Sequence, residues 1–473
     1  MNVSVFSFSL AGLFYLLLHT VVTVHILLFK EDVKSAIGWI GLVWLAPIVG
    51  SIIYVLFGIN RIHRKALVLS SRKPARKLIE KSNADTLSSL SPSFLQFLKL
   101  GYHVHPQNFS IGNTILPFEN GDEAYPAMCR LIRHAKHYVW LQSYIFDNDA
   151  AGEMFVHAFE EAAQRGVQIK VLIDGVGLNY SSPTIVTALK KIPHLETAVF
   201  LPSKHPINLP FVNLRNHRKI LIVDGMYAFF GGMNIAAGNL VKTKTKEPIR
   251  DITFQASGPI VEQIARVFKE DWVFSTQTNL VHTPQRHDKN GSVAARIIPD
   301  GPDSNYGKLS LLFIGALGSA QQKIQIVTPY FLPEEDILSA LEVAAMRGIL
   351  VEIILPQKSN IWGMDRAMRA NFARLLARGI KIYRTPSPFD HSKLFLIDDE
   401  WVCIGSANWD VRSLKLNFEC VMECLNKNLA ANVAAIVERK KQKAQRENIT
   451  VLRQRPWYQI LIDNAFKLLT PYY

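Results

Sequence analysis

One short pattern of residues, His-x-Lys-x4-Asp, occurs twice in this chain of 473 residues. The first copy runs from His217 to Asp224 and the second from His391 to Asp398, and an asparagine lies seventeen residues after each histidine. Three other His-x-Lys sequences in the chain lack the aspartate. At ordinary residue frequencies a single full copy would arise by chance in roughly one of thirty such chains. Two matched copies therefore indicate a duplicated unit.

The residues between the lysine and the aspartate are apolar in both copies, which is typical of a buried strand. Because side chains two positions apart point to the same face of a strand, the histidine and lysine of each copy lie together. Asp224 and Asp398 complete the motifs. Each of them begins the turn after its strand and faces away from the histidine, which indicates a structural role.

Phosphodiester chemistry explains why these residue types would occur together. A neutral imidazole can attack phosphorus, while a protonated imidazole can act as general acid for the leaving alkoxide. Lysines and asparagines would stabilise charge on the phosphoryl oxygens. No cluster of residues with metal-ligand spacing stands out, so we expect neither a metal nor a cofactor. The candidate residues are His217, Lys219, Asp224, Asn234, His391, Lys393, Asp398 and Asn408.

The strands and helices around the motifs also alternate twice. The expected elements are a strand at 138–146, a helix at 151–164 and a strand at 167–173, then a strand at 323–331, a helix at 335–346 and a strand at 350–355. This repetition predicts an α/β fold of two similar halves.

Two apolar stretches begin the chain, at residues 3–29 and 36–57, and each is long enough to cross a bilayer. A secretory signal peptide is the alternative for the first stretch, but neither Lys nor Arg precedes it. Eight basic residues between positions 61 and 81 are opposed by Glu80 alone. By the positive-inside rule, this run predicts that the remainder of the chain lies in the cytoplasm.

The formal net charge of +14 indicates an anionic partner, which could be a phospholipid, a membrane surface or a nucleic acid. Two membrane spans and the lack of a basic and aromatic single-strand groove pattern argue against nucleic acid. Near the carboxyl end, the basic stretch 438–447 is followed by apolar residues at helical spacing. This tail fits either a helix at the membrane interface or a helix packed on the core. The four cysteines lack metal-ligand spacing and are expected to be reduced core residues.

The motifs, together with the sequences at 213–216, 328–331 and 405–413, resemble the phospholipase D superfamily. More narrowly, the chain is similar to bacterial cardiolipin synthases over nearly its whole length. The resemblance implies two fused α/β halves with one active site at their interface, a phosphohistidine intermediate and no need for a metal. Residues 388–390 depart from the usual family pattern, which puts the acceptor specificity in question.

The resemblance also implies roles for individual residues. His217 would be the nucleophile and His391 the general acid. Asp251 and Glu419, about thirty residues after the two motifs, would each orient the histidine of the other half and raise its pKa. The implied reaction moves a phosphatidyl group from one phosphatidylglycerol to another and releases glycerol. Another headgroup exchange, or hydrolysis, by the same site is the alternative.

From these features we expect four parts: a two-helix transmembrane hairpin at 1–59, a basic linker at 60–106, a first half at 107–290 and a second half with an amphipathic tail at 291–473. The expected protein is a multi-pass protein of the bacterial inner membrane, with its catalytic part in the cytoplasm. Its expected partners are phosphatidylglycerol and anionic membrane lipids, not nucleic acid.

Overall fold

The computed structural model describes residues 2–30, 32–59, 92–202, 214–243, 245, 247–280 and 289–470. It divides into two compact units, Met1–Pro74 with Lys204–Val212, and Ala75–Ser203 with Asn213–Tyr473. The basic run at 61–81, Asn213 and the last three residues of the tail lie outside the described residues. The predicted orientation in the membrane, which depends on that run, stays a prediction.

The first unit contains one long helix and one broken helix. Helix α1 (Asn2–Phe29) includes an apolar segment long enough to cross a membrane. The second apolar stretch forms α2 (Val33–Leu45), α3 (Pro47–Ile53) and a π-helical turn, η1 (Tyr54–Gly58). Ala46 leaves the helical region, with φ −137° and ψ 76°, because the ring of the following proline disfavours helical geometry before it. The expected second continuous span is therefore interrupted, and two membrane crossings stay a prediction.

The helices of this unit pack on one another through a small apolar cluster that includes Val22, Ile26, Val43 and Tyr54. The indole nitrogen of Trp44 donates to the Thr23 hydroxyl at 3.1 Å. These contacts join α1 to the second apolar stretch. The two-helix transmembrane hairpin stays a prediction.

The second unit is built on a 15-stranded mixed sheet of the described residues. Its strands in the first half are β1 (Ser110–Glu119), β2 (Tyr138–Ser143), β3 (Gln168–Asp174), β4 (Leu195–Phe200), β5 (Lys219–Val223), β6 (Tyr227–Gly231) and β8 (Ile252–Ser257). Those in the second half are β9 (Val293–Asp300), β10 (Lys323–Val327), β12 (Leu350–Pro356), β13 (Lys381–Thr385), β15 (Leu394–Ile397), β16 (Trp401–Gly405), β18 (Glu419–Leu425) and β19 (Gln445–Arg446). Two short pairs lie apart from it, β11 (Phe331–Leu332) with β17 (Trp409–Asp410), and β14 (Phe389–Asp390) with β7 (Ile249–Arg250).

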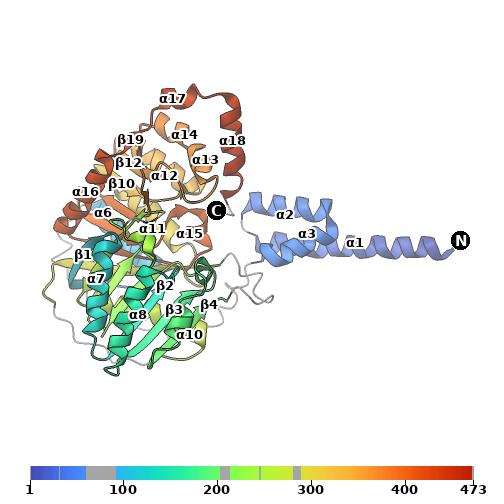
Figure 1. The fold of residues 1–473 in the computed structure, drawn as a ribbon. Helices are drawn as coiled ribbons and strands as arrows, with labels where there is room; N and C mark the ends of the chain where they lie inside the picture. The colour runs from blue at the N-terminus through green and yellow to red at the C-terminus, as the bar shows by residue number, and fades with distance from the viewer. Residues whose placement is uncertain are drawn as a thin grey trace. The chain divides into compact units, whose positions relative to one another are not determined.

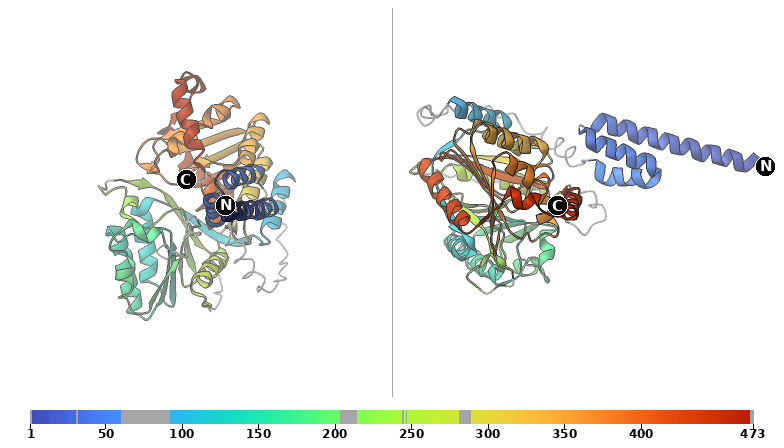
Figure 2. Two further views of the ribbon diagram at one scale, coloured as in Figure 1. Left: turned by 90° about the vertical axis from the view of Figure 1, so that its right-hand side faces the viewer. Right: turned by 90° about the horizontal axis from the view of Figure 1, so that it is seen from above.

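The strand order repeats about the centre of the sheet. The first half runs β4-β3-β2-β5-β6-β8-β1 from its outer edge, and the second, inside its additional edge strand β19, runs β13-β12-β10-β15-β16-β18-β9. β1 and β9 pair antiparallel and join the halves into one sheet. The first half, with β2, β3 and β4, and the second half, with β10 and β12, are labelled in Figure 1. Figure 2 shows the first half, cyan to green, continuing into the second half, yellow to red. The predicted α/β fold of two similar halves is confirmed.

Helices cover both faces of each half. The first half has α7 (Asn120–Arg133), α8 (Ala150–Ala163), η2 (Gly177–Tyr180), α9 (Val186–Leu189), η4 (Ala237–Asn239) and α10 (Ile260–Thr276). The second half has α11 (Lys308–Ser319), α12 (Glu335–Met346), α13 (Met364–Arg369), α14 (Phe372–Ala377), α15 (Val411–Lys415) and α16 (Lys427–Gln442). Leu141 packs among residues of α7 and α8, whereas its neighbour Trp140 stacks on Phe268 of α10. Because alternate strand residues face opposite sides, these helices lie on opposite faces of the sheet.

Three predicted elements differ in extent from the observed ones. The strand expected at 138–146 ends at Ser143 as β2. The strand expected at 323–331 divides into β10 and β11, because Pro329 between them has no N–H to donate to a ladder. The stretch expected as a linker includes helix α6 (Pro92–Val104), which packs on α11 of the second half. The predicted domain boundaries themselves stay predictions.

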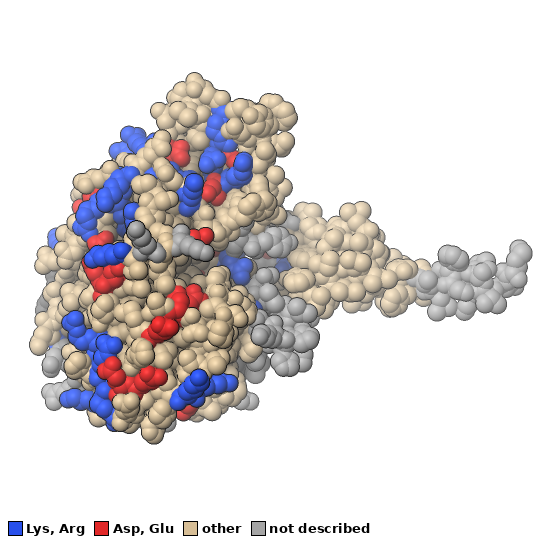
Figure 3. Space-filling view, in the orientation of Figure 1, with Lys and Arg blue, Asp and Glu red and all other residues tan. Residues whose placement is uncertain are grey.

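The carboxyl-terminal tail contains a helix that packs on the second half and also exposes apolar side chains. Lys and Arg side chains gather over α16 on the face shown in Figure 3. Beyond it, α17 (Ile449–Arg453) leads to α18 (Trp457–Lys467). One face of α18 packs on α13, with buried Asp463 paired to Arg455, while Trp457 and Leu461 on the helix are 75% and 59% exposed. Contact of that exposed face with a membrane stays a prediction.

Candidate active site

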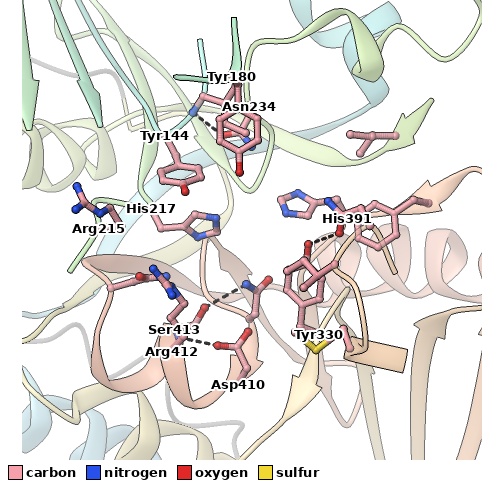
Figure 4. Close-up of a pocket in the computed structure, with 18 of the residues that line it drawn as sticks. Tyr144, Tyr180, Arg215, His217, Asn234, Tyr330, His391, Asp410, Arg412 and Ser413 are labelled. Atoms are coloured by element: carbon pink, nitrogen blue, oxygen red, sulfur yellow. Dashed lines mark hydrogen bonds between the residues drawn. The ribbon is translucent and has the colours of Figure 1, made fainter. Parts of the chain in front are cut away.

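A pocket of about 190 Å³ lies where the two halves meet (Figure 4). It is smaller than the roughly 300–1,000 Å³ typical of pockets that enclose drug-sized molecules, so it suits a small polar group rather than an entire large ligand. Its lining comes from both halves and includes both motif histidines. The polar lining residues include Tyr144, Arg215, His217 and Asn234 from the first half and Tyr330, His391, Asn408 and Arg412 from the second.

The two histidines face one another across this pocket. The imidazole centroids of His217 and His391 are 6.4 Å apart, and the ring planes are nearly perpendicular, at 82°. Each residue is buried, with 8% and 9% of its surface exposed. A phosphorus atom between the rings would therefore be within reach of both imidazoles.

Each histidine is held by a carboxylate from the opposite half. The Nδ1 atom of His391 lies 2.7 Å from Asp251, and that of His217 lies 3.0 Å from Glu419. The backbone reinforces both pairs, because the His217 N–H donates to the carbonyl of Phe418 at 2.9 Å and the His391 N–H donates to that of Arg250 at 2.7 Å.

These pairs determine the tautomer of each ring. A neutral imidazole that donates from Nδ1 to a carboxylate keeps its lone pair on Nε2. Nε2 of each ring is then the atom available to a ligand. The carboxylate of Glu419 is itself fixed by the Ser406 hydroxyl, at 2.5 Å, and the Asn417 amide, at 3.2 Å.

The two orienting carboxylates favour the protonated histidines, as expected from the sequence, but burial makes the net change in histidine pKa a decrease. Burial lowers the pKa of both His217 and His391 to about 4, and the lysine charges add to this effect. Glu419 and Asp251 do favour protonation of the rings, as expected, but they do not offset the loss of hydration. Both imidazoles are therefore neutral near pH 7 when no ligand is bound.

The motif lysines lie beside the histidines but do not line the main pocket. Lys219 donates to the carbonyl of His217 at 2.7 Å, and Lys393 donates to that of His391 at 2.6 Å. Burial lowers the pKa of Lys393 to about 8 and that of Lys219 well below its usual value. Gly232 allows this packing, because a Cβ atom there would lie 2.9 Å from the Cδ of Lys393.

The motif aspartates are remote from the pocket lining and bind backbone. Asp224 accepts the N–H groups of residues 136–138 at 2.8–2.9 Å, and Asp398 accepts those of residues 321–323 at 2.6–2.8 Å. Both residues have φ of 52°, the left-handed turn geometry that Asp tolerates. Each carboxylate thus joins the end of its motif strand to the beginning of a neighbouring strand.

Both asparagines line the pocket. The side-chain oxygen of Asn234 accepts the N–H of Ile145 at 3.2 Å, and the amide of Asn408 donates to the Ser413 hydroxyl at 3.1 Å. The roles that the sequence suggests for these asparagines, the lysines, the histidines and the two orienting carboxylates stay predictions.

The pocket also contains residues that the sequence reasoning did not select. Tyr144 follows β2 and lies 5.3 Å from the His217 ring, while Tyr330 follows β10 and lies 6.3 Å from the His391 ring. The ends of strands in open α/β sheets commonly carry ligand-binding residues, and this was the available signal. Arg412 had no such signal, because a short helix after β17 brings it into the pocket.

Within the described ranges, no group of three His, Cys, Asp or Glu side chains could hold a metal ion. The four cysteines are buried and form no disulfide. Independence from metals remains an expectation for experiment.

Comparison with known proteins gives consistent relationships. The family model described as "Cardiolipin synthase, PLD-like domain" matches residues 128–272 and 313–441, and the model "Phospholipase_D-nuclease N-terminal" matches residues 17–58. A cardiolipin synthase of Geobacillus kaustophilus is 31% identical over 87% of this chain and 84% of its own length. Cardiolipin synthase 1 of Bacillus cereus is 32% identical over 85% of this chain and 82% of its own length.

Among solved structures, the phosphatidylserine synthase of Haemophilus influenzae superimposes with a TM-score of 0.59 at 15% identity, covering 80% of this chain and 99% of that protein. This likeness shows the shared fold. The two-part family match covers the same two halves that the sheet topology reveals, and the resemblance inferred from the motifs is confirmed. The chain belongs to the PLD-like cardiolipin synthase family.

Proposed function

We propose that this protein is a cardiolipin synthase that moves a phosphatidyl group from one phosphatidylglycerol to a second, with release of glycerol. The observation that carries this proposal is the pair of facing imidazoles, each held through Nδ1 by a carboxylate of the opposite half. Such a pair supplies a nucleophile on one side of a phosphodiester and a proton donor on the other.

In the first step, Nε2 of His217 attacks the phosphorus of the donor lipid. The bond from phosphorus to the glycerol oxygen breaks, and His391 transfers its proton to that oxygen, so glycerol leaves. A phosphatidyl group then remains on His217 and His391 is neutral.

In the second step, neutral His391 takes the proton from the terminal hydroxyl of another phosphatidylglycerol. The hydroxyl oxygen attacks phosphorus, the bond to Nε2 of His217 breaks, and the electron pair returns to the imidazole. The product is cardiolipin, and His391 again carries the proton.

The charge of the substrate is part of this mechanism. Burial and the neighbouring lysines lower the pKa of His391 to about 4, so the proton needed for acid catalysis is not held by the free protein at pH 7. An anionic phosphodiester in the pocket favours the imidazolium and supplies the missing opposite charge. Lys219 and Lys393, close behind the rings, would stabilise the phosphoryl oxygens.

The amino-terminal unit would keep this chemistry at a bilayer. An apolar α1 joined to the shorter apolar helices α2 and α3 supports membrane attachment, and we extend this to two crossings with the catalytic unit in the cytoplasm. The exposed Trp457 and Leu461 of α18 would add a second contact with the lipid surface. Anchoring concentrates the acceptor lipid and favours transfer over hydrolysis.

The test uses full-length protein in phosphatidylglycerol vesicles, with all products quantified. We expect cardiolipin and glycerol in equal amounts, little phosphatidic acid and no effect of a chelator. Deletion of residues 1–59 should lower either the cardiolipin to phosphatidic acid ratio or the rate on vesicles, yet leave activity on detergent-dispersed lipid. Phosphatidic acid as the main product of the full-length protein would favour the alternative, hydrolysis by the same site.

A further inference from the structure

The pocket contains a cation that the proposed two-histidine mechanism does not use. Arg412 lines the pocket together with His217, and Figure 4 shows it on the His217 side of the site. Within the described part of the chain, its guanidinium forms neither a hydrogen bond nor an ion pair. Its N–H donors are therefore available to a ligand.

The backbone around Arg412 is firmly held. Asp410 caps α15 by accepting the Ser413 N–H at 2.7 Å, and the Ser413 hydroxyl accepts from the Asn408 amide. The carbonyl of Arg412 accepts two backbone N–H groups, from Leu416 and Asn417, at 2.9 Å each. The guanidinium is thus carried on a preorganised turn.

A second guanidinium reinforces the positive charge in this part of the pocket. Arg215 also lines the pocket, and its pKa is lowered by burial and, to a smaller extent, by the positive charge of Arg412. Arg215 forms an ion pair with Asp174 at 3.7 Å, and Asp174 also accepts the backbone N–H of Asn216 at 2.9 Å and that of Val176 at 2.8 Å.

Asp410 is an acidic residue of the pocket lining. Its carboxylate accepts the Ser413 N–H and makes no ion pair with Arg412 among the described residues. Burial raises the pKa of Asp410 to about 6, so its carboxylate is mostly ionised at pH 7 and offsets one of the two guanidinium charges. The feature that suits this side of the pocket to an anion is therefore the set of N–H donors on Arg412, which lines the pocket.

We propose that Arg412, with Arg215 behind it, binds the phosphate of the acceptor phospholipid while the donor phosphate reacts between the histidines. This inference rests on the proposed function, in which two lipids each bring one phosphate to the pocket. The acceptor phosphate does not react, so it needs a binding group but no nucleophile. Arginine suits this task because its planar fork can donate two parallel hydrogen bonds to a phosphate.

Such a site would determine acceptor choice. An acceptor held by its phosphate presents its terminal hydroxyl to the phosphohistidine with an advantage in effective concentration over water and neutral alcohols. Arg412 would then be a specificity residue for an anionic glycerophospholipid acceptor and would not be required for attack on the donor.

The experiment uses the full-length Arg412→Gln variant and compares two acceptors, phosphatidylglycerol and free glycerol, with the same phosphatidylglycerol donor. Cardiolipin formation from phosphatidylglycerol should fall by about 10- to 100-fold, as expected for loss of a charge-assisted bidentate contact. Exchange of labelled free glycerol into phosphatidylglycerol should be unchanged, because that acceptor has no phosphate. Hydrolysis to phosphatidic acid should also be unchanged, so the product ratio shifts.

The matched control is Lys415→Gln, which removes a cation from the same helix. Lys415 pairs with Glu334 at 2.6 Å and is not among the pocket-lining residues. It should leave both reactions unchanged. Arg215 is less suitable as a test position because it also donates to the Leu201 carbonyl at 3.1 Å and supports the fold.

Equal losses in cardiolipin synthesis and glycerol exchange would overturn the inference, since Arg412 would then act on the donor phosphate. Unchanged rates in both reactions would overturn it as well. Failure of the wild-type protein to make cardiolipin at all would instead contradict the proposed function, so the two failures are distinguishable.

Discussion

The two halves hold their motif histidines in the same way but support them with charges in opposite positions. In the first half, Arg218 beside the motif histidine pairs with Asp271 of α10 at 2.6 Å. In the second half Ser392 stands at the position of Arg218, and Asp390 pairs with Lys440 of α16 at 2.6 Å. The cation is thus near the motif in one half and on the helix in the other.

A second difference between the halves lies farther from the pocket. Trp140 of β2 stacks on Phe268 of α10, with ring centroids 5.2 Å apart. Gln325 occupies the corresponding position of β10 and donates to Glu352 and Glu438, and Lys441 of α16 is ion-paired with Glu352. At this one position of the strand, the contact between sheet and helix is apolar in the first half and polar in the second.

This comparison shows that the strand order of a half does not determine which charged pairs are buried beside its motif. The strand order and the contacts of each histidine with the opposite half are the same in both halves. The buried ion pairs differ in both partners at once, because the cation and the anion have exchanged places. Exchange of α10 for α16 would bring Arg218 toward Lys440 and Asp390 toward Asp271, and buried charges without partners are costly. The departure at 388–390 noted in the sequence is explained in part by this pairing of Asp390.

The largest expected effect is the loss of turnover when either motif histidine is replaced, and an activated donor distinguishes their roles. With phosphatidylglycerol, His217→Ala and His391→Ala should each lower turnover by about 10³-fold or more, because one lacks the nucleophile and the other the proton donor. A donor lipid with a p-nitrophenolate leaving group needs no proton, so His391→Ala should still release a burst of nitrophenol and His217→Ala should not. A phosphoryl adduct trapped on His391 would reverse the assigned roles.

The second effect concerns the orienting carboxylates. Glu419→Gln and Asp251→Asn should each lower turnover by about 10²- to 10⁴-fold, since the tautomer of the paired imidazole is no longer enforced. Only the Asp251 variant should recover on the nitrophenolate donor, because Asp251 supports the acid. Ser406→Ala, which removes one hydrogen bond to Glu419, is the control and should have a smaller effect. Recovery of both variants, or of neither, would contradict distinct roles for the two halves.

The third effect is a proton uptake. Because burial lowers the pKa of both histidines to about 4, both imidazoles are neutral in the free protein at pH 7. An anionic ligand that raises the pKa of His391 above 7 must therefore be accompanied by uptake of a proton from solvent. Calorimetric titration with tungstate in buffers of different ionisation enthalpy should show uptake of roughly one proton per site. His217→Ala should retain this uptake and His391→Ala should lose it. Uptake that follows His217 instead would exchange the roles.

The last prediction concerns the stability of the fold, and its expected effect on activity is the smallest. Arg218→Met should lower the free energy of unfolding by about 3–5 kcal/mol, because it leaves Asp271 buried without its cation. Arg218 also donates to the carbonyls of Glu419 and Asp300, at 2.9 Å each. Lys440→Met should cost less, since the Lys440 side chain is 13% exposed against 3% for Arg218. Denaturant unfolding measures both, and equal losses would show that the two pairs are equivalent.

Much of the fold could be predicted from local patterns. The repeated alternation of strands and helices and the spacing of the two motifs are short-range features, so α8, β3, α12 and β12 lie close to their predicted positions. The broken second helix was missed because apolar length was counted without weighting Pro47, whose ring disfavours helix at Ala46. Pattern alone also did not foresee α6 within the expected linker.

The sequence by itself determined that the chain is a duplicated α/β protein with two His-x-Lys-x4-Asp motifs and an apolar beginning, because periodicity and spacing are written along the chain. The tertiary structure alone decided which groups share the pocket and how they are charged. Arg412 and Tyr144 meet His217 only through folding, and the pKa of about 4 for both histidines results mainly from burial. Burial and contact between distant segments depend on the packed interior, and no local run of residues contains that information.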